Sequence, residues 1–515
     1  MIYPIGIQDF ESLRLDGYAY VDKTALVHKM VNTGRYYFLS RPRRFGKSML
    51  LSTLHAYLSG KRELFHGLAI EQLETEWTAY PILHLDLNTA RYEKKESLDE
   101  VLDYHLSRWE RRYGVEEGEA SLALRFLGIV ERAFKKTGRR VVILVDEYDK
   151  PMLQAIGNEP LLDEYRQTLK AFYSVLKTQD RYIKFAFLTG VTKFSKVSIF
   201  SDLNNLQDIS MDERFIDICG ITEQELHTFF ADSVRELAAK NGLTEEQCYA
   251  RLRKKFDGYH FEHDTVGIYN PFSVLNTLAK QRFRDYWFET GTPSFLVELL
   301  KKTDYKLDNL QKEEVTADLL NSIDSMNTNP IPVIYQSGYL TIKDYNPEFD
   351  CYRLGFPNEE VETGFVRYLL PLYTPLEQSQ SASYIAKFVT EVRTGDVDGF
   401  MERLSAMFED NDYRVAGKME IYFQNTMYVI FKMMGFFTQV ERATSRGRID
   451  IVIQTQDYVY VVEIKLDGSA DEALRQIEQK GYAKPFAQDK RTVYKIGVNF
   501  SSATRSISEW KIEEQ

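Results

Sequence analysis

The chain has 515 residues, which is too long for one ordinary hydrophobic core and predicts several domains in series. Its formal net charge of -11 repels polyanions, so any nucleic-acid contact has to rest on local basic groups or bound metal. Three widely spaced cysteines exclude a disulfide framework and a Cys-x-x-Cys metal knuckle. With no signal-peptide pattern and no run of about 18 apolar residues, we expect a cytoplasmic protein that makes no membrane contact.

Short apolar runs alternate with helix-length amphipathic stretches through the N-terminal half. The expected strands are 36–40, 82–87, 141–147 and 183–190, and the expected helices are 46–58, 97–113, 121–137 and 160–177. This order is the βαβ pattern of an α/β domain, a parallel sheet covered on both faces. In such sheets ligands bind beyond the carboxyl ends of the strands, so we look for functional residues there.

The first expected strand leads into a basic loop, SRPRRFGKSML at 40–50, that ends as a phosphate-binding loop does. In the motif G-x-x-x-x-G-K-[ST], backbone N–H groups bind phosphate, Lys47 reaches the β- and γ-phosphates, and the Ser48 hydroxyl ligates Mg²⁺. Arg41 stands where the motif has its first glycine, and a non-glycine residue resists positive φ, which leaves the loop conformation open there. The alternative interpretation is a basic turn that caps a helix.

A second motif supports nucleotide binding, because the apolar strand VVILV is followed by Asp146 and Glu147. We expect Asp146 to hold Mg²⁺ and Glu147 to orient and deprotonate the attacking water. The next strand ends at Thr189, whose hydroxyl is a weaker candidate for sensing the γ-phosphate. The candidate nucleotide-binding residues are Arg44, Gly46, Lys47, Ser48, Asp146 and Thr189.

The middle of the chain carries no comparable motif. Residues 220–315 are predicted to form a helical lid. Its first helix is expected to begin after Thr222, with Thr222 as N-cap and Glu225 as its capping-box partner. The order of helix-like and strand-like segments in 316–400 predicts a small winged-helix module or connector with a β-hairpin. Such modules bind DNA in some proteins and only pack against the ATPase in others, and the sequence does not choose between these roles.

A third group of candidates lies on an expected β-hairpin, GRIDIVIQTQDYVYVVEIK at 447–465. A tight turn centred on residues 456 and 457 places Asp450 opposite Glu463, with Cβ atoms roughly 5 Å apart. Lys465, two residues further, lies on the same face. Opposed carboxylates repel unless a divalent cation lies between them, so the pattern predicts a metal site at Asp450 and Glu463 beside a lysine. The alternative is a solvated hairpin.

The chain resembles bacterial AAA-ATPase-like proteins with a C-terminal PD-(D/E)XK nuclease-like domain, over nearly its whole length. The motifs that carry the resemblance are YAYVDKT (18–24), SRPRRFGKSML (40–50), VDEYDKP (145–151), LTGVTKFSKVSIFSDLNN (188–205) and the GRIDIVI…EIK hairpin. The resemblance implies ATP as nucleotide and Mg²⁺, or Mn²⁺, as metal. It also implies catalytic roles for Asp450, Glu463 and Lys465, and supporting roles for Glu420 on a preceding helix and for Gln476 and Tyr482 on a following helix, 470–483.

We therefore expect four segments: a P-loop AAA-ATPase-like domain at 1–219, a helical lid at 220–315, the connector at 316–400, and a restriction-endonuclease-like α/β domain at 401–515. The expected function is ATP binding and hydrolysis coupled to metal-dependent cutting of DNA or RNA. The alternative is a nucleotide-dependent switch or scaffold whose C-terminal domain binds nucleic acid or a partner without cutting. A homo-oligomer is compatible with the sequence, because many such ATPases use an arginine from a neighbouring subunit.

Overall fold

The computed structural model divides the chain into two compact units. Unit 1 comprises Met1–Leu299 and Gln311–Val361, and unit 2 comprises Leu300–Leu310 and Glu362–Gln515. The structure describes residues 1–193, 205–288, 296, 299–300, 303–311, 313–320, 329–374, 376–409, 419–435, 439–445 and 448–515. Of these, only the backbone is described for 378, 379, 381, 419, 420, 439–445 and 448–450. Each unit is considered by itself.

Unit 1 is built on a five-stranded parallel sheet with the strand order β2-β3-β4-β1-β5. The strands are β1 (Tyr36–Ser40), β2 (Ile82–Asp86), β3 (Val141–Asp146), β4 (Ile183–Gly190) and β5 (Gln207–Asp208). Every residue of β1 and β3 is buried, as continuous apolar runs in a doubly covered sheet should be. The predicted order of strands and helices in the N-terminal half is therefore confirmed.

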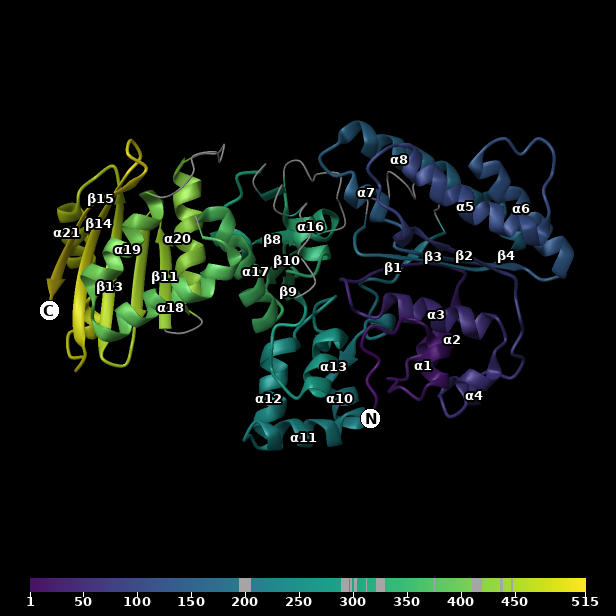
Figure 1. The fold of residues 1–515 in the computed structure, drawn as a ribbon, viewed down its shortest axis with the longest axis horizontal. Coiled ribbons are helices and arrows are strands. Elements are labelled where there is room, and N and C mark those ends of the chain that lie inside the picture. The colour runs from purple at the N-terminus through teal and green to yellow at the C-terminus, as the bar shows by residue number, and fades with distance from the viewer. Residues whose placement is uncertain are drawn as a thin grey trace. The chain divides into compact units, whose positions relative to one another are not determined.

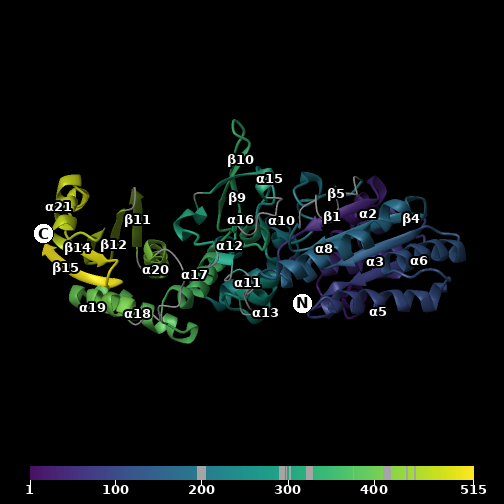
Figure 2. The same ribbon diagram turned by 90° about the horizontal axis from the view of Figure 1, so that it is seen from above.

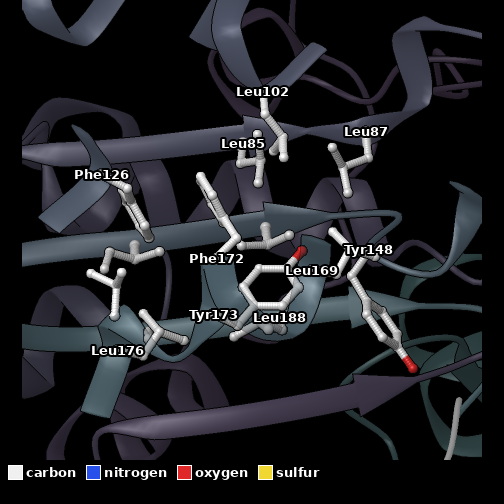
Figure 3. Close-up of a cluster of buried hydrophobic side chains, with 14 of the residues drawn as sticks. Leu85, Leu87, Leu102, Phe126, Tyr148, Leu169, Phe172, Tyr173, Leu176 and Leu188 are labelled. Atoms are coloured by element: carbon white, nitrogen blue, oxygen red, sulfur yellow. The ribbon is translucent and has the colours of Figure 1, made fainter. Parts of the chain in front are cut away.

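Helices cover both faces of this sheet. Helix α3 (Lys47–Leu58) lies on one face, and α5 (Glu96–Tyr113), α6 (Leu122–Thr137) and α8 (Glu159–Tyr173) lie on the other (Figure 1). Figure 3 shows the core between the sheet and the second group, where the rings of Phe126 and Phe172 stack with centroids 4.4 Å apart. Shorter helices add to both layers: α1 (Phe10–Leu15), α2 (Thr24–Thr33) and α4 (Ile70–Leu73) lie on the side of α3, and α7 (Lys150–Gln154) and α9 (Val175–Thr178) lie with α8 (Figure 1).

A helical lid follows the sheet within unit 1. Its helices are α10 (Glu223–Phe229), α11 (Ala231–Lys240), α12 (Glu245–Phe256) and α13 (Pro271–Lys280), with a short antiparallel pair of β6 (Ile221–Thr222) and β7 (Ile268–Tyr269). The predicted capping box is confirmed, because Thr222 and Glu225 cap α10 reciprocally. Residues 223–240 form two helices, α10 and α11, and not one continuous helix. Phe230, at φ -124° and ψ 14°, lies between them, and its ring is buried in the lid core.

The rest of unit 1 contains the hairpin that the middle segment predicts. Helices α15 (Ala317–Leu320) and α16 (Ile331–Gln336) precede β9 (Thr341–Asn346) and β10 (Cys351–Gly355), which pair antiparallel. Strand β8 (Glu314–Thr316) pairs on the other side of β10. Figure 2 shows β9 and β10 as a narrow projection.

Unit 2 is a mixed five-stranded sheet with helices on both faces. Its strands, in sheet order, are β11 (Gln439–Ser445), β12 (Arg448–Gln454), β13 (Tyr458–Leu466), β14 (Thr492–Ser501) and β15 (Ser506–Glu514). Only β13 and β14 run parallel, and α21 (Ala470–Lys480) connects them, as a parallel crossover requires. The other helices are α17 (Glu359–Tyr373), whose first three residues belong to unit 1, α18 (Gln378–Thr394), α19 (Val397–Glu409) and α20 (Met419–Gly435).

The position of α18 differs from the expected segmentation. This helix falls within the expected connector, 316–400, yet it belongs to unit 2, where the Tyr460 hydroxyl donates to the carbonyl of Val392 at 2.7 Å. Helix α21 and the helices α18–α20 cover opposite faces of the sheet, because alternate residues of β13 point to each side.

Within the described ranges, none of the helices combines the length and the apolar character needed to cross a bilayer. The three cysteines are free thiols, and Cys219 and Cys248 are buried.

Candidate active sites

The basic loop after β1 adopts left-handed backbone at two positions. Gly46 has φ 94° and is the N-cap of α3, and Arg44 has φ 67°. Arg41, at the first-glycine position of the general motif, is not among the residues with positive φ. The arginine that stands in place of the motif's glycine therefore causes no left-handed backbone strain. The left-handed backbone of the loop lies at Arg44 and Gly46 instead.

Arg41 is a buried structural group. Its guanidinium donates to the carbonyls of Ser210 at 2.7 Å and Ile216 at 3.2 Å, and its central carbon lies 3.9 Å from the ring centroid of Phe261. Burial lowers the pKa of Arg41 to about 10. The side chain thus connects the loop to the segment after β5 and to the part of the lid between α12 and β7, a structural role that sequence reasoning missed.

Lys47 is held over the loop in the position of a phosphate-binding cation. Its side chain is 4% exposed, and Nζ donates to the carbonyls of Arg41 at 3.0 Å and Pro42 at 3.3 Å. Nζ also lies 3.9 Å from a carboxylate oxygen of Glu147. Loop carbonyls and one carboxylate are weak substitutes for a polyphosphate, so the ammonium is available to an anion that enters the site.

Asp146 and Ser48 bring two hard oxygen donors together. The Asp146 carboxylate is almost fully buried, and burial, followed by the neighbouring charge of Glu147, raises its pKa to about 6. A hydrogen bond from the Ser48 hydroxyl and the charge of Lys47 oppose this rise. Burial disfavours the ionised form of the Asp146 carboxylate. A divalent cation bound to this carboxylate and to the adjacent Ser48 hydroxyl would stabilise the ionised form.

Glu147 occupies a strained position directly after β3. Its φ is 53°, an unfavourable value for a residue with a Cβ, and its amide donates to the Asp146 carboxylate at 3.0 Å. The side chain lines the same cavity as Lys47 and Ser48. Backbone strain of this kind is kept at functional sites, so we read the turn as a means of directing Glu147 toward the cavity.

Thr189 lies within the sheet. Its side chain is fully buried, and its hydroxyl donates to the carbonyl of Leu39 at 3.0 Å. Its role toward a γ-phosphate stays a prediction.

Asp149 is a polar residue that the sequence reasoning did not single out. It is fully buried, and its carboxylate accepts from the amides of Val191 at 3.1 Å and Thr192 at 2.6 Å. Burial raises its pKa to about 6. Asp149 thereby connects the turn that carries Glu147 to the residues directly after β4. In the sequence, the position of Asp149 three residues after Asp146 in VDEYD was the signal that could have identified it.

Lys47, Ser48 and Glu147 line a cavity of about 420 Å³. Its walls come from the N-terminal segment 4–23, from the loop and first turns of α3 at 43–53, and from the lid between 218 and 275. The lid contributes apolar side chains, including Phe230, Phe272 and Leu275. Arg44 stacks on Phe272, with its guanidinium carbon 3.7 Å from the ring centroid. The cavity therefore has a cationic end at the loop and an apolar end under the lid.

Unit 2 contains the second candidate site, on the hairpin of β12 and β13. The backbone register pairs Asp450 with Glu463, as the turn arithmetic predicts. Glu463 is fully buried, and the Lys465 ammonium donates to its carboxylate at 3.1 Å. The same ammonium donates to the side-chain oxygen of Gln476 on α21. The structure thus joins Glu463, Lys465 and Gln476, and places Asp450 at the opposing register position.

The two supporting residues outside the hairpin are placed as follows. Glu420 belongs to α20 (Met419–Gly435), as expected, and its side chain lies outside the described part. Helix α21 ends at Lys480 because Gly481 takes φ 66°, so Tyr482 lies beyond the helix and not on it as predicted. Tyr482 packs against the apolar cluster between α21 and the sheet.

Among the side chains that the structure describes, no three His, Cys, Asp or Glu residues gather into a metal-binding group. The hairpin site depends on a carboxylate pair of which Glu463 is the described member. A buried carboxylate with a register-paired Asp450 fits a hard divalent cation such as Mg²⁺, which uses few protein ligands and keeps several waters.

Comparison with known proteins gives one match for the N-terminal part of the chain and one for the C-terminal part. Residues 4–200 match the family model of predicted AAA-ATPases, and residues 418–510 match that of the PD-(D/E)XK nuclease superfamily. A protein of Azotobacter chroococcum mcd 1, described as an uncharacterized protein in the vnfD 5' region, is 35% identical over 521 residues, covering 99% of this chain and 98% of that protein.

A solved structure of the Aeropyrum pernix ORC2 protein (ADPNP–ADP complexes) matches with a TM-score of 0.27 and 11% identity, covering 64% of this chain and 88% of that chain. The predicted family and fold class are confirmed by the family models. The chain belongs to the family of predicted AAA-ATPases that carry a C-terminal domain of the PD-(D/E)XK nuclease superfamily.

Proposed function

We propose that the chain binds and hydrolyses ATP in unit 1 and cuts phosphodiester bonds of DNA or RNA in unit 2. The observation that carries the first activity is the convergence of Lys47, Ser48 and Glu147 on one cavity, with Asp146 bonded to Ser48. The second activity rests on the pairing of Asp450 with Glu463 beside Lys465.

In unit 1, each residue has a role that its surroundings support. Lys47 and the amides at the start of α3 bind the phosphates, and the apolar end of the cavity receives the base. Glu147 orients a water molecule and accepts its proton. Ser48 and Asp146 would hold Mg²⁺, which supplies positive charge to the phosphate oxygens when bound.

In unit 2, Lys465 is the cation that approaches the scissile phosphate. Gln476 and Glu463 fix its ammonium from two sides, so the lysine is positioned before substrate arrives. Asp450 and Glu463 would hold Mg²⁺, which makes a bound water more acidic when present. Since the whole chain carries a formal net charge of -11, nucleic acid has to be attracted locally, at such cationic groups.

The test separates the two activities with single substitutions. We expect Lys47→Ala to abolish ATP binding, measured by titration calorimetry, while metal-dependent cutting by unit 2 is retained. Lys465→Ala should abolish cutting of nucleic acid and leave ATP turnover intact. Retained ATP affinity in Lys47→Ala would contradict the loop assignment, and persistent cutting in Lys465→Ala would contradict the hairpin assignment.

An outcome with ATP binding but no cutting under any condition would favour a nucleotide-dependent switch whose unit 2 binds nucleic acid or a partner. The intact set of Asp450, Glu463 and Lys465 favours the nuclease.

A further inference from the structure

The N-terminal wall of the nucleotide cavity carries one charged side chain. The described lining residues with formal charge are Arg43, Arg44, Lys47 and Glu147 at the loop and β3, and Lys23 from the N-terminal segment. Lys23 is 9% exposed and stands at the N-cap position of α2. A nearly buried cation outside the phosphate-binding loop needs a reason to be there.

A well-anchored turn presents Lys23. The Asp22 carboxylate accepts from the amide of Thr24 at 2.8 Å and from its hydroxyl at 2.6 Å, and it also accepts from the amide of Ala69 at 2.7 Å. The backbone on either side of Lys23 is therefore fixed. Its ammonium is directed at one partner, the carboxylate of Glu225, at 2.5 Å.

Glu225 serves two purposes in the lid. One carboxylate oxygen accepts from the amide of Thr222 at 2.8 Å, which completes the capping box of α10. The other oxygen binds Lys23. The chain shows that a cap alone does not require a charge, because α12 has the same box with Gln247 in the equivalent position. The negative charge of Glu225, which the cap does not need, pairs with the ammonium of Lys23.

The contacts around this ion pair are largely apolar. Tyr3 stacks on Phe230 of the lid with ring centroids 6.4 Å apart, and Ala19 and Val21 pack against the lid core. A hydrogen bond between Tyr3 and Ser233 is a further polar contact. Apolar surfaces attract without fixing direction, so the ion pair and the hydrogen bond between Tyr3 and Ser233 direct how the lid lies against the N-terminal wall, and of these residues Lys23 lines the cavity.

We propose that Lys23 and Glu225 form a latch that positions the lid over the nucleotide cavity, and that nucleotide affinity depends on this pair although neither residue lies in the phosphate-binding loop. The proposal rests on ATP binding in unit 1. Both are positioning residues: they hold the apolar wall formed by Phe230, Phe272 and Leu275 in place for the base.

The test is calorimetric titration of the full chain with ATP and Mg²⁺. Glu225→Gln removes the charge and keeps the capping box, so α10 should stay folded and the unfolding midpoint of the unliganded variant should fall only by the loss of the ion pair, while its Kd for ATP rises about tenfold, within the usual range of coupling between elements. Lys23→Arg keeps the charge and should bind ATP as wild type does. Arg253→Met breaks another ion pair of α10, with Glu223, and should leave ATP affinity unchanged, because Arg253 does not line the cavity.

A double substitution completes the cycle. Lys23→Met with Glu225→Gln should bind ATP no more weakly than Lys23→Met alone, because the two residues act through each other. The latch is refuted if Glu225→Gln binds ATP as tightly as wild type or more tightly; tighter binding is the result expected of a Lys23 released to contact the phosphates. If the wild-type chain binds no ATP, the proposed nucleotide function fails, and the latch fails with it.

Discussion

Among single residues, Asp146 is a buried carboxylate whose ionisation lowers the stability of the folded protein. Its pKa is raised from 3.8 to about 6, chiefly by burial. The folded chain therefore holds a proton that the unfolded chain has lost between these two values, and the free energy of unfolding falls as pH rises through that window. The proposed role of Asp146 as a ligand of Mg²⁺ would account for keeping a carboxylate where ionisation is unfavourable.

This predicts the effect of Asp146→Asn on the unliganded, magnesium-free protein. At pH 7 the variant should be more stable than wild type by about 2–3 kcal/mol, as follows from a shift of about two pKa units. The gain should vanish near pH 4, where both chains are uncharged at this position. Chemical denaturation at several pH values measures it, and equal stability at pH 7 would show that the ionised carboxylate is well accommodated. Addition of ATP and Mg²⁺ should stabilise wild type more than the variant.

Glu147 gives the second residue-scale prediction. Glu147→Gln keeps the size of the side chain but cannot accept a proton, so ATP turnover should fall by about 10²- to 10⁴-fold while ATP affinity stays near that of wild type. Phosphate release and calorimetry measure the two quantities. Glu246→Gln, an exposed change on α12, is the control. Turnover equal to wild type would remove Glu147 as the base.

At the scale of elements, α21 positions the side chain that holds Lys465. Ser469 is its N-cap and accepts from the amide of Glu472 at 3.2 Å, and Gln476 lies two turns into the helix. Ser469→Ala should lower the free energy of unfolding of unit 2 by about 1 kcal/mol, the usual effect of losing a cap. Ser469→Asp keeps a capping oxygen and should retain most of the stability, so equal losses in both variants would contradict the capping role.

The sequence predicted those elements whose signals are local. The apolar runs located β1, β3 and β4, and alternation with a tight turn predicted the pairing of Asp450 with Glu463, because the register of a hairpin is set by its own residues. The capping box of α10 was equally local.

Features that depend on distant contacts could not be predicted. Arg41 is buried because of Ser210 and Ile216, which lie 169 and 175 residues away in the sequence. The break between α10 and α11 follows from the burial of the Phe230 ring in the lid core. Likewise, the ion pair of Lys23 could not be predicted, because its partner Glu225 lies 202 residues away in the sequence.

At the scale of the whole molecule, the chain combines two compact units, each with its own sheet and its own site. In unit 1, Lys47, Ser48 and Glu147 follow strands of the parallel sheet and line one cavity, and in unit 2 the mixed sheet pairs Asp450 with Glu463 in backbone register. The chain passes between the two units at 299/300, 310/311 and 361/362, and the last of these crossings lies within α17.

A cleavage assay tests whether unit 2 is a nuclease that responds to ATP binding in unit 1. Single- and double-stranded DNA and RNA are incubated with Mg²⁺ or Mn²⁺, with and without ATP, using wild type, Asp450→Ala and Lys47→Ala. We predict metal-dependent cutting that responds to ATP in wild type, is lost in Asp450→Ala and no longer responds to ATP in Lys47→Ala. Absence of cutting on every substrate, or undiminished cutting by Asp450→Ala, would contradict the account of the chain as an ATP-coupled nuclease.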